Sequence, residues 1–298
     1  PGQQKETGHR YILGLYHIMK VLTLRFPKIL FEGCASGGNR FDLGMLCYMP
    51  QIWASDNTDA VCRAKIQEGY SYRYPASCYS AHVSGCPNHH TLRVTPLDTR
   101  FHIACFGLLG YECNLAEHSK EELAKIGEQI TLYKKWREVL QFGDFYRITE
   151  LEGNGTQEEN QSGTYQWLCV SKDKKRAVAM MMQTWNMPNT VYRKFVMKGL
   201  LETGLYHFYN ISQKVNVKDF GSLINIMAPV HIKQDSLLHN VVARVMKLEG
   251  EKEDYQAYGD TLMNAGVRLA PSFGGTGFNE QVSVLKDYDS RLYFLEQI

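Results

Sequence analysis

Residues 29–60 carry the pattern that decides the fold, and they read ILFEGCASGGNRFDLGMLCYMPQIWASDNTDA. Two short apolar runs, at 29–31 and 49–53, each lead into a loop of small and polar residues. Continuous apolar runs of this length are typical of strands buried on both faces, as in a parallel sheet covered by helices. The stretch therefore predicts two strands of a parallel sheet, each followed by a polar loop.

Helical patterns surround these two strands. Residues 5–26 place an apolar side chain at every third or fourth position, which predicts a half-buried helix that Pro27 ends. After the loop at 55–59, a second helix is predicted to about Glu68, with Gly69 as its C-terminal cap.

Two more units of the same kind follow. A third strand is predicted within 71–84 and a helix after Pro96; a fourth strand is predicted at 106–113. The next helix begins at a Ser-x-x-Glu capping box at Ser119 and reaches about Gln141. Four strand-loop-helix units favour either half of a (β/α)8 barrel or a small doubly wound sheet, and periodicity leaves both open.

The pattern changes after Gly143. Short β-rich runs follow, at 165–170, 176–182, 192–198 and 205–209. They predict an antiparallel β domain, with one inserted helix near 238–248 and a closing strand at 291–296. We therefore expect two domains, 1–147 and 148–298.

Composition narrows the classes of partner. The 298 residues hold 33 Lys plus Arg and 31 Asp plus Glu, a formal net charge of +2, which argues against a nucleic-acid partner. No apolar run approaches the roughly 18 residues of a membrane span, so we expect a soluble protein with no membrane partner. The eight cysteines form no Cys-x-x-Cys pair, which favours the reducing cytoplasm. Because the chain begins Pro-Gly, we expect residues upstream of it.

Polar residues just beyond a strand are the candidate functional groups, because parallel sheets carry their sites on these loops. The loop at 32–40 combines Cys34 and Arg40 with glycines that let backbone N–H groups approach a ligand, although a tight structural turn is the alternative. The next loop holds Trp53, Asp56 and Asp59. Asp59 stands at the predicted start of a helix, where the helix dipole favours a negative charge, so a structural role is an alternative for it. This alternative does not apply to Asp56. An aromatic ring beside a carboxylate is typical of sugar sites, where the ring stacks on the sugar and the carboxyl moves a proton.

The string over 31–60 closely resembles the α-galactosidases of glycoside hydrolase family 36. Further matches are Ser-Ala-His-Val-Ser at 80–84, Gly-Tyr-Glu at 110–112, Gln-Phe-Gly-Asp-Phe-Tyr-Arg at 141–147 and Met-Asn-Ala-Gly at 263–266. The resemblance implies the second half of a (β/α)8 barrel followed by a C-terminal antiparallel β-sandwich domain. It also implies a cytoplasmic enzyme without a cofactor that forms a homo-oligomer at full length.

The resemblance implies roles for individual residues. Asp56 matches the general acid/base, and Trp53 falls where the family places an aromatic residue near the sugar. The residues that match the family's galactose-binding loop are Cys34, Ser36, Gly37 and Arg40. The family's nucleophile is an aspartate in a Lys-Trp-Asp motif, whereas the one Lys-Trp here, at 135–136, is followed by Arg137. We therefore expect the nucleophile upstream of this chain, and these residues alone to be inactive.

The expected reaction is the retaining hydrolysis of terminal α-linked galactose from oligosaccharides such as melibiose and raffinose. An α-N-acetylgalactosaminidase or a galactosyl transferase on the same scaffold is the alternative among enzymes, and a non-catalytic sugar-binding fragment is the alternative outside them. Four possible soft metal ligands, His82, Cys86, His89 and His90, match no standard zinc spacing, so no metal is expected.

Overall fold

The first half of the chain folds around a parallel sheet. The computed structural model describes residues 3–34, 39–148, 150–151, 163–186, 193–226, 228–269 and 284–298. Its first four strands are β1 (Glu32–Gly33), β2 (Gln51–Trp53), β3 (Tyr79–Ser84) and β4 (Leu108–Glu112). They lie side by side in chain order, and every neighbouring pair is parallel, as the sequence predicted.

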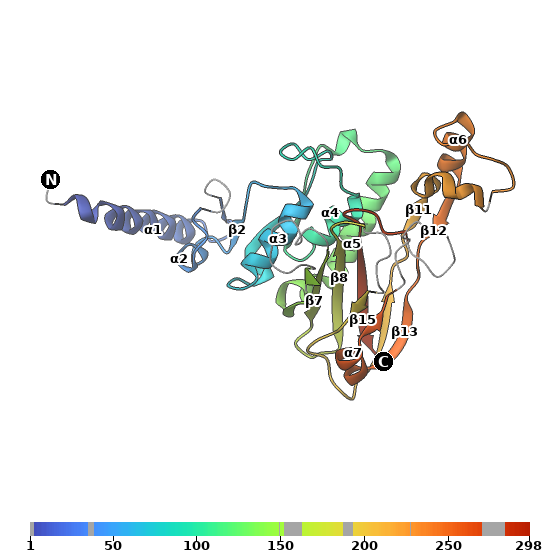
Figure 1. The fold of residues 1–298 in the computed structure, drawn as a ribbon. Helices are drawn as coiled ribbons and strands as arrows, with labels where there is room; N and C mark the ends of the chain where they lie inside the picture. Colours follow the sequence, from blue (N-terminus) through green and yellow to red (C-terminus); the bar gives the residue numbers. More distant parts are fainter. Residues whose placement is uncertain are drawn as a thin grey trace.

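Helices follow three of these strands and cover one face of the sheet (Figure 1). They are α3 (Ala60–Tyr70), α4 (Leu97–Ala104) and α5 (Lys120–Phe142), and the short α2 (Leu43–Leu46) precedes β2. The capping box predicted at Ser119 is present at the start of α5. Gly69 is not a cap, because the chain stays right-handed through Ser71, the residue that caps α3.

The N-terminal helix contacts the rest of the molecule only in part, through residues such as Tyr16, which bonds to Asp42 and packs on Tyr48. Helix α1 (Thr7–Arg25) forms where predicted, but it buries no residue and projects from the body in Figure 1. Ile29 and Leu30 are also exposed, and β1 begins only at Glu32. The prediction of a buried strand at 29–31 was therefore wrong. The predicted half-buried helix holds in part, because Leu15, Met19 and Leu22 are partly buried whereas Ile12 is exposed.

The second half of the chain is built on an antiparallel sheet of seven strands. Its order is β13-β10-β15-β8-β7-β5, with β6 also paired to β7. The strands are β5 (Asp144–Arg147), β6 (Glu150–Leu151), β7 (Gly163–Val170), β8 (Arg176–Gln183), β10 (Leu205–Asn210), β13 (Asp254–Tyr258) and β15 (Ser290–Gln297). The closing strand β15 lies in the middle, between β10 and β8. The predicted antiparallel β domain is confirmed.

Both faces of this sheet are buried. Alternation along β7 and β8 sends Trp167, Met180 and Met182 into a core shared with Trp136 on α5. The residues between them, such as Met181, pack into a second core on the other face. The parallel unit is therefore joined to the antiparallel sheet by a continuous hydrophobic core rather than by a flexible linker.

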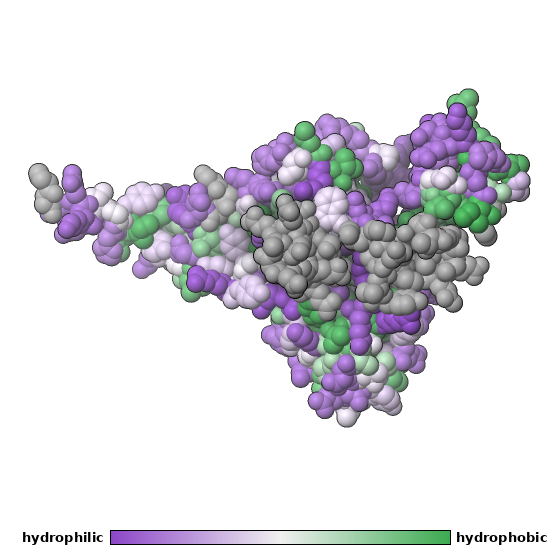
Figure 2. All heavy atoms as spheres, in the orientation of Figure 1, coloured by the Kyte–Doolittle hydropathy of each residue, from purple (hydrophilic) through white to green (hydrophobic). Residues whose placement is uncertain are grey.

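Smaller elements complete the described chain. The ladder of β9 (Lys194–Phe195) with β14 (Val267–Arg268) and the short helix α7 (Gly259–Asn264) lie over the second core. A separate arm holds β11 (Lys214–Asn216), η5 (Val217–Ile226), α6 (Leu237–Val245) and β12 (Lys247–Glu249). Figure 2 shows apolar residues on this arm. Helix α6 ends before the predicted residue 248, because that segment pairs with β11. The finer prediction of a sandwich stays a prediction.

Within the described residues, no helix has both the length and the apolar character that a membrane-crossing segment requires.

Candidate functional site

The parallel sheet has a polar face opposite its helices. Along β3, Tyr79, Ala81 and Val83 are fully buried in the hydrophobic core, so the residues between them point the other way. Contacts across the strands join six side chains on that side, which we call the polar face: Glu32, Gln51, Trp53, Ser80, His82 and Glu112.

Trp53 and Asp56 are joined at the carboxyl end of β2. The Trp53 indole Nε1–H donates to Asp56 Oδ1 over 3.0 Å; the ring is buried and the aspartate is exposed. The Arg63 guanidinium from α3 lies 4.9 Å from the centroid of the Trp53 ring and donates to the Ser80 carbonyl oxygen over 2.7 Å. Burial lowers the pKa of Arg63 to about 10, so it is still charged at neutral pH. An exposed carboxyl group is thus held beside an ordered aromatic ring.

Asp59 lies three residues further on, in a different environment. Its buried carboxylate caps α3 by accepting the Cys62 backbone N–H over 3.0 Å, and it also accepts from Thr91 Oγ1 over 2.7 Å and from Arg93 over 2.5 Å. Burial raises the pKa of Asp59, but these three partners outweigh burial and hold the pKa below its usual range. Asp59 therefore has the structural role that the sequence left open.

The loop after β3 braces the loop that carries Asp56. Asn88 Nδ2 donates to Thr58 Oγ1 and Ser84 Oγ donates to the Thr58 carbonyl oxygen, each over 3.0 Å and in the protein interior. Because buried hydrogen bonds of this kind are costly to break, the loop between Trp53 and α3 is held in one conformation.

His82 and Glu112 belong to the same constellation, and the sequence analysis did not assign them a role in it. The His82 ring stacks on Trp53 with centroids 4.4 Å apart and planes inclined by 22°. Its Nδ1 lies 3.0 Å from Glu112 Oε2. His82 pairs with Gly110 across β3 and β4, and a Cβ at Gly110 would lie 2.6 Å from the imidazole. The period-two alternation along β3 and β4 was the signal that could have found them.

A second hydrogen-bonded group lies nearer the amino ends of the strands. Gln51 Nε2 donates to Ser80 Oγ over 2.9 Å and to Glu32 Oε1 over 3.2 Å, and the Ser80 hydroxyl donates to the same Glu32 oxygen. No sequence pattern indicated this group. It places one more carboxylate on the polar face.

The predicted sugar-binding loop is described at its two ends. The parallel register of β1 with β2 places Cys34 at the same end of the sheet as Trp53. The Cys34 thiol is exposed and free, and Arg40 is exposed in a turn. Ser36 and Gly37 lie outside the described residues.

The four possible soft ligands do not converge on one point. His82 contacts Glu112, whereas the rings of His89 and His90 pack on each other with centroids 3.9 Å apart. In the part of the chain that the structure describes, no group of three His, Cys, Asp or Glu side chains is placed to hold a metal ion.

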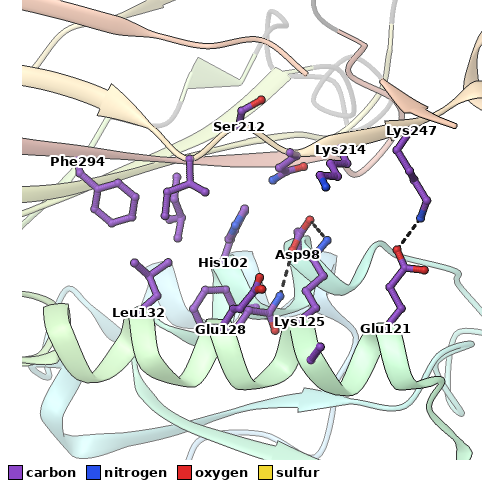
Figure 3. Close-up of a pocket in the computed structure, with 16 residues that line it drawn as sticks. Asp98, His102, Glu121, Lys125, Glu128, Leu132, Ser212, Lys214, Lys247 and Phe294 are labelled. Carbon is purple, nitrogen blue, oxygen red and sulfur yellow. Dashed lines mark hydrogen bonds and ion pairs between the residues drawn. The ribbon is translucent and has the colours of Figure 1, made fainter. Parts of the chain in front are cut away.

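A pocket of about 430 Å³ lies elsewhere, between α5 and the antiparallel sheet (Figure 3). Two of its carboxylates are matched by lysines: Asp98 pairs with Lys125 over 2.5 Å, and Glu121 pairs with Lys247 over 2.6 Å. Burial lowers the pKa of His102 in its floor to about 4, so this ring is neutral. The pocket holds none of the predicted site residues, and its ion pairs link α5 to α4 and to the arm.

Comparison with known families gives matches over both halves of the chain. The Melibiase family profile matches residues 1–143. The profile described as the glycosyl hydrolase family 36 C-terminal domain matches residues 164–295.

Individual relatives are similar over part of their length. AgaA of Geobacillus stearothermophilus, an α-galactosidase, is 45% identical over 201 residues, which are 67% of this chain and 26% of AgaA. α-Galactosidase 1 of Pediococcus pentosaceus is 44% identical over 198 residues, which are 66% of this chain and 26% of the relative. The chain thus spans about a quarter of the length of the curated relatives it matches.

Solved structures match the whole chain. The α-galactosidase of Lactobacillus brevis superposes with a TM-score of 0.76 at 36% identity, covering 100% of this chain and 33% of that one. An AgaA variant from Geobacillus stearothermophilus, in complex with raffinose, superposes with a TM-score of 0.74 at 33% identity and the same coverage.

Proposed function

The chain belongs to glycoside hydrolase family 36, and on that premise we propose that the full natural protein carrying these residues is a retaining α-galactosidase. Its substrates are oligosaccharides with a terminal α-linked galactose, such as melibiose and raffinose. The relatives named α-galactosidases and the neighbour solved with raffinose support this choice. The observation that carries it is the hydrogen bond from the Trp53 indole to the exposed carboxyl group of Asp56.

Asp56 is the general acid/base of this reaction. In the first step, a carboxylate nucleophile attacks C1 of the galactose while the C1–O bond breaks, and Asp56 gives its proton to the leaving oxygen. In the second step, Asp56 takes a proton from water, the water oxygen attacks C1, and the nucleophile leaves as a carboxylate. The hydrogen bond from Trp53 to Oδ1 orients the carboxyl group, so that Oδ2 exchanges the proton.

The nucleophile comes from outside these 298 residues. The chain contains no Lys-Trp-Asp sequence, and its one Lys-Trp pair lies within α5, where Trp136 is buried. Asp59 is a poor substitute, because its carboxylate is buried and committed to Cys62, Thr91 and Arg93. We therefore propose that residues 1–298 alone have no hydrolase activity.

The sugar is held by the loop that follows β1. Cys34 and Arg40, together with Ser36 and Gly37, are the proposed contacts to the galactose hydroxyl groups. The exposure of Cys34 and Arg40 and the position of Cys34 beside Trp53 support this assignment.

The four parallel strands form one half of a (β/α)8 barrel, spanning 1–147, and 148–298 form the β domain. The chain order of β1 to β4, the absence of a fully buried residue in α1 and the one-third coverage of the structural neighbours support this division. The eight free cysteines support a cytoplasmic location. The exposed apolar side chains of α6 support a homo-oligomer.

The test is turnover by the full natural protein. It should release galactose from raffinose and from an aryl α-galactoside, and it should hydrolyse the matching α-N-acetylgalactosaminide much more slowly. Binding of galactose without release from either substrate would contradict the proposal and identify a sugar-binding protein.

A further inference from the structure

We propose that His82 and Glu112 are positioning residues that hold the Trp53 ring, and through it the Asp56 carboxyl group, in the reactive orientation. This inference rests on the role proposed above for Asp56. It concerns two side chains from neighbouring strands that neither the resemblance nor the comparisons assign to the reaction.

The contacts run in one unbroken series. Glu112 Oε2 lies 3.0 Å from His82 Nδ1, the His82 ring stacks at 4.4 Å on Trp53, and the Trp53 N–H donates to Asp56 Oδ1 over 3.0 Å. When Glu112 is ionised, the carboxylate selects the tautomer with the proton on Nδ1, since a carboxylate only accepts. The imidazole is thereby fixed at one edge while its face lies on the indole.

The neighbouring strand leaves room for this arrangement. Gly110 stands opposite His82 in the ladder of β3 with β4, and any side chain there would meet the imidazole, with Cβ 2.6 Å from Cδ2 and 2.9 Å from Nε2. Gly110 does not adopt a left-handed conformation, so backbone geometry does not require glycine there. What favours glycine at position 110 is therefore the imidazole of His82, which occupies the space that a side chain would need.

Stability alone is a weak explanation for the pair. The Glu112 side chain is 63% exposed and that of His82 is 22% exposed. Exposed ion pairs contribute only about 0–1 kcal/mol to folding. The pair instead lies where orientation matters, because a misplaced catalytic group can cost a factor of about 100 in rate.

Trp53 needs this support on the side that faces the site. Arg63 holds the ring from α3, where the guanidinium is buried and bonded to the Ser80 carbonyl oxygen. Without His82, the indole would keep Arg63 but lose its stacking partner on the polar face. Its N–H would then sample directions away from Asp56.

The test compares variants of the full natural protein on substrates with poor and good leaving groups. A disoriented acid slows the hydrolysis of raffinose, because the leaving oxygen of raffinose needs a proton. It slows the hydrolysis of an aryl α-galactoside less, because an acidic phenol leaves without one. We expect His82→Ala to lower kcat/KM, which reports the first step, by about tenfold or more on raffinose and by less than about twofold on the aryl substrate. His82→Phe, which keeps a ring on the indole, should recover most of the loss.

Two further variants keep the inference testable if His82→Ala folds poorly. Gly110→Ala displaces the imidazole and should reproduce the selective loss on raffinose. Gly85→Ala is the matched control, because a Cβ there meets nothing within 4 Å. Equal losses on both substrates in His82→Ala and Gly110→Ala, or no loss in either, would overturn the inference.

A spectroscopic measurement separates this inference from the proposed function. His82→Ala should change the near-ultraviolet circular dichroism spectrum relative to wild type. This difference should vanish when wild type and His82→Ala are compared again with Trp53→Phe introduced into each. If wild-type protein hydrolyses neither substrate, the proposed function fails, whereas this signal still reports on the stacking. An unchanged spectrum in His82→Ala would overturn the inference whatever the activity.

Discussion

Two aspartates three residues apart differ in what surrounds each carboxyl group. Asp56 is exposed and accepts a hydrogen bond from the Trp53 indole. Asp59 is buried beneath the same loop and is bonded to the start of α3, to Thr91 and to Arg93. The first is suited to exchange a proton with substrate, and the second to hold the loop in place.

Asp59→Ala should lower the free energy of unfolding by about 2 kcal/mol, the cost of a lost helix cap and buried hydrogen bonds. Asp56→Ala should change it by less than about 0.5 kcal/mol, as for other exposed positions. Urea unfolding at pH 7 measures both. Equal effects of the two substitutions would contradict the assignment of roles.

The contribution of Asp59 should depend on pH. Its pKa is lower in the folded protein than in the unfolded chain, so its stabilisation is present above an unfolded pKa of about 3.9 and is lost as pH falls through the folded value. The gap in stability between wild type and Asp59→Asn should therefore narrow below about pH 4. Urea midpoints measured between pH 7 and pH 3 check this, and a gap that widens in acid would contradict it.

Cys34→Ala should weaken galactose binding by the full natural protein about two- to tenfold, the worth of one hydrogen bond. Because Cys34 is an exposed loop residue with a free thiol, the melting temperature should stay within a few degrees. Calorimetric titration and thermal unfolding measure the two quantities. A fall of more than about 10 °C would instead make Cys34 a structural residue.

Local patterns predicted part of the site at the scale of residues. Trp53 and Asp56 lie within one loop, so their proximity could be read from the chain. His82 and Glu112 lie on separate strands, and the contact of each with the site depends on the register of β3 with β4. Register depends on packing over the whole sheet, which a short sequence window does not contain.

At the scale of elements, the antiparallel sheet is fastened to the parallel unit by side chains from β7. Trp167 is fully buried, packs edge-on against Phe106 and Phe145, and donates its indole N–H to Glu68 Oε2 over 2.8 Å. One residue thus combines a buried aromatic contact with a hydrogen bond to α3.

Trp167→Ala should destabilise the protein by about 3–5 kcal/mol, the usual cost of removing a buried large aromatic side chain. Trp185→Ala is the matched control, because Trp185 is 40% exposed, and it should cost less than about 1 kcal/mol. Chemical unfolding compares the two variants. A cost as small for Trp167 as for Trp185 would show that this contact does not join the two units.

Long elements with a strong period were predicted well. Helix α5 and strands β7, β8 and β15 each carry enough residues to repeat their pattern. Among the shortest strands, β2 and β9 lie within predicted runs, whereas β11 and β14 were not predicted; they contain too few residues to show a pattern, and each forms beside a partner strand. Tertiary pairing decides these elements, and a window of sequence cannot display it.

At the scale of the whole molecule, α1 and the edges of the parallel sheet are the surfaces that we expect another segment of chain to cover. Several apolar side chains of α1 are exposed: Tyr11, Ile12, Leu13, Ile18, Val21 and Leu24. Exposed apolar surface of this kind marks an interaction site. In the half-barrel proposal, chain outside these 298 residues covers it.

Residues 1–298 expressed alone should therefore associate with themselves. Light scattering should give a mass above that of the 34.1 kDa monomer, and Leu13→Lys with Leu24→Lys should shift the mass towards the monomer. His9→Lys with His17→Lys, which adds charge at exposed polar positions of α1, serves as the control. A monodisperse monomer with an unaltered α1 would contradict the half-barrel proposal.

The central claim is that Asp56 is the general acid/base, and the kinetics of Asp56→Ala in the full natural protein test it most directly. An aryl α-galactoside with a good leaving group needs no proton to depart, so its first step should survive far better than that of melibiose. Azide, which attacks the glycosyl intermediate without a base, should then speed turnover of the aryl substrate. Equal losses on both substrates, with no rescue by azide, would contradict the claim.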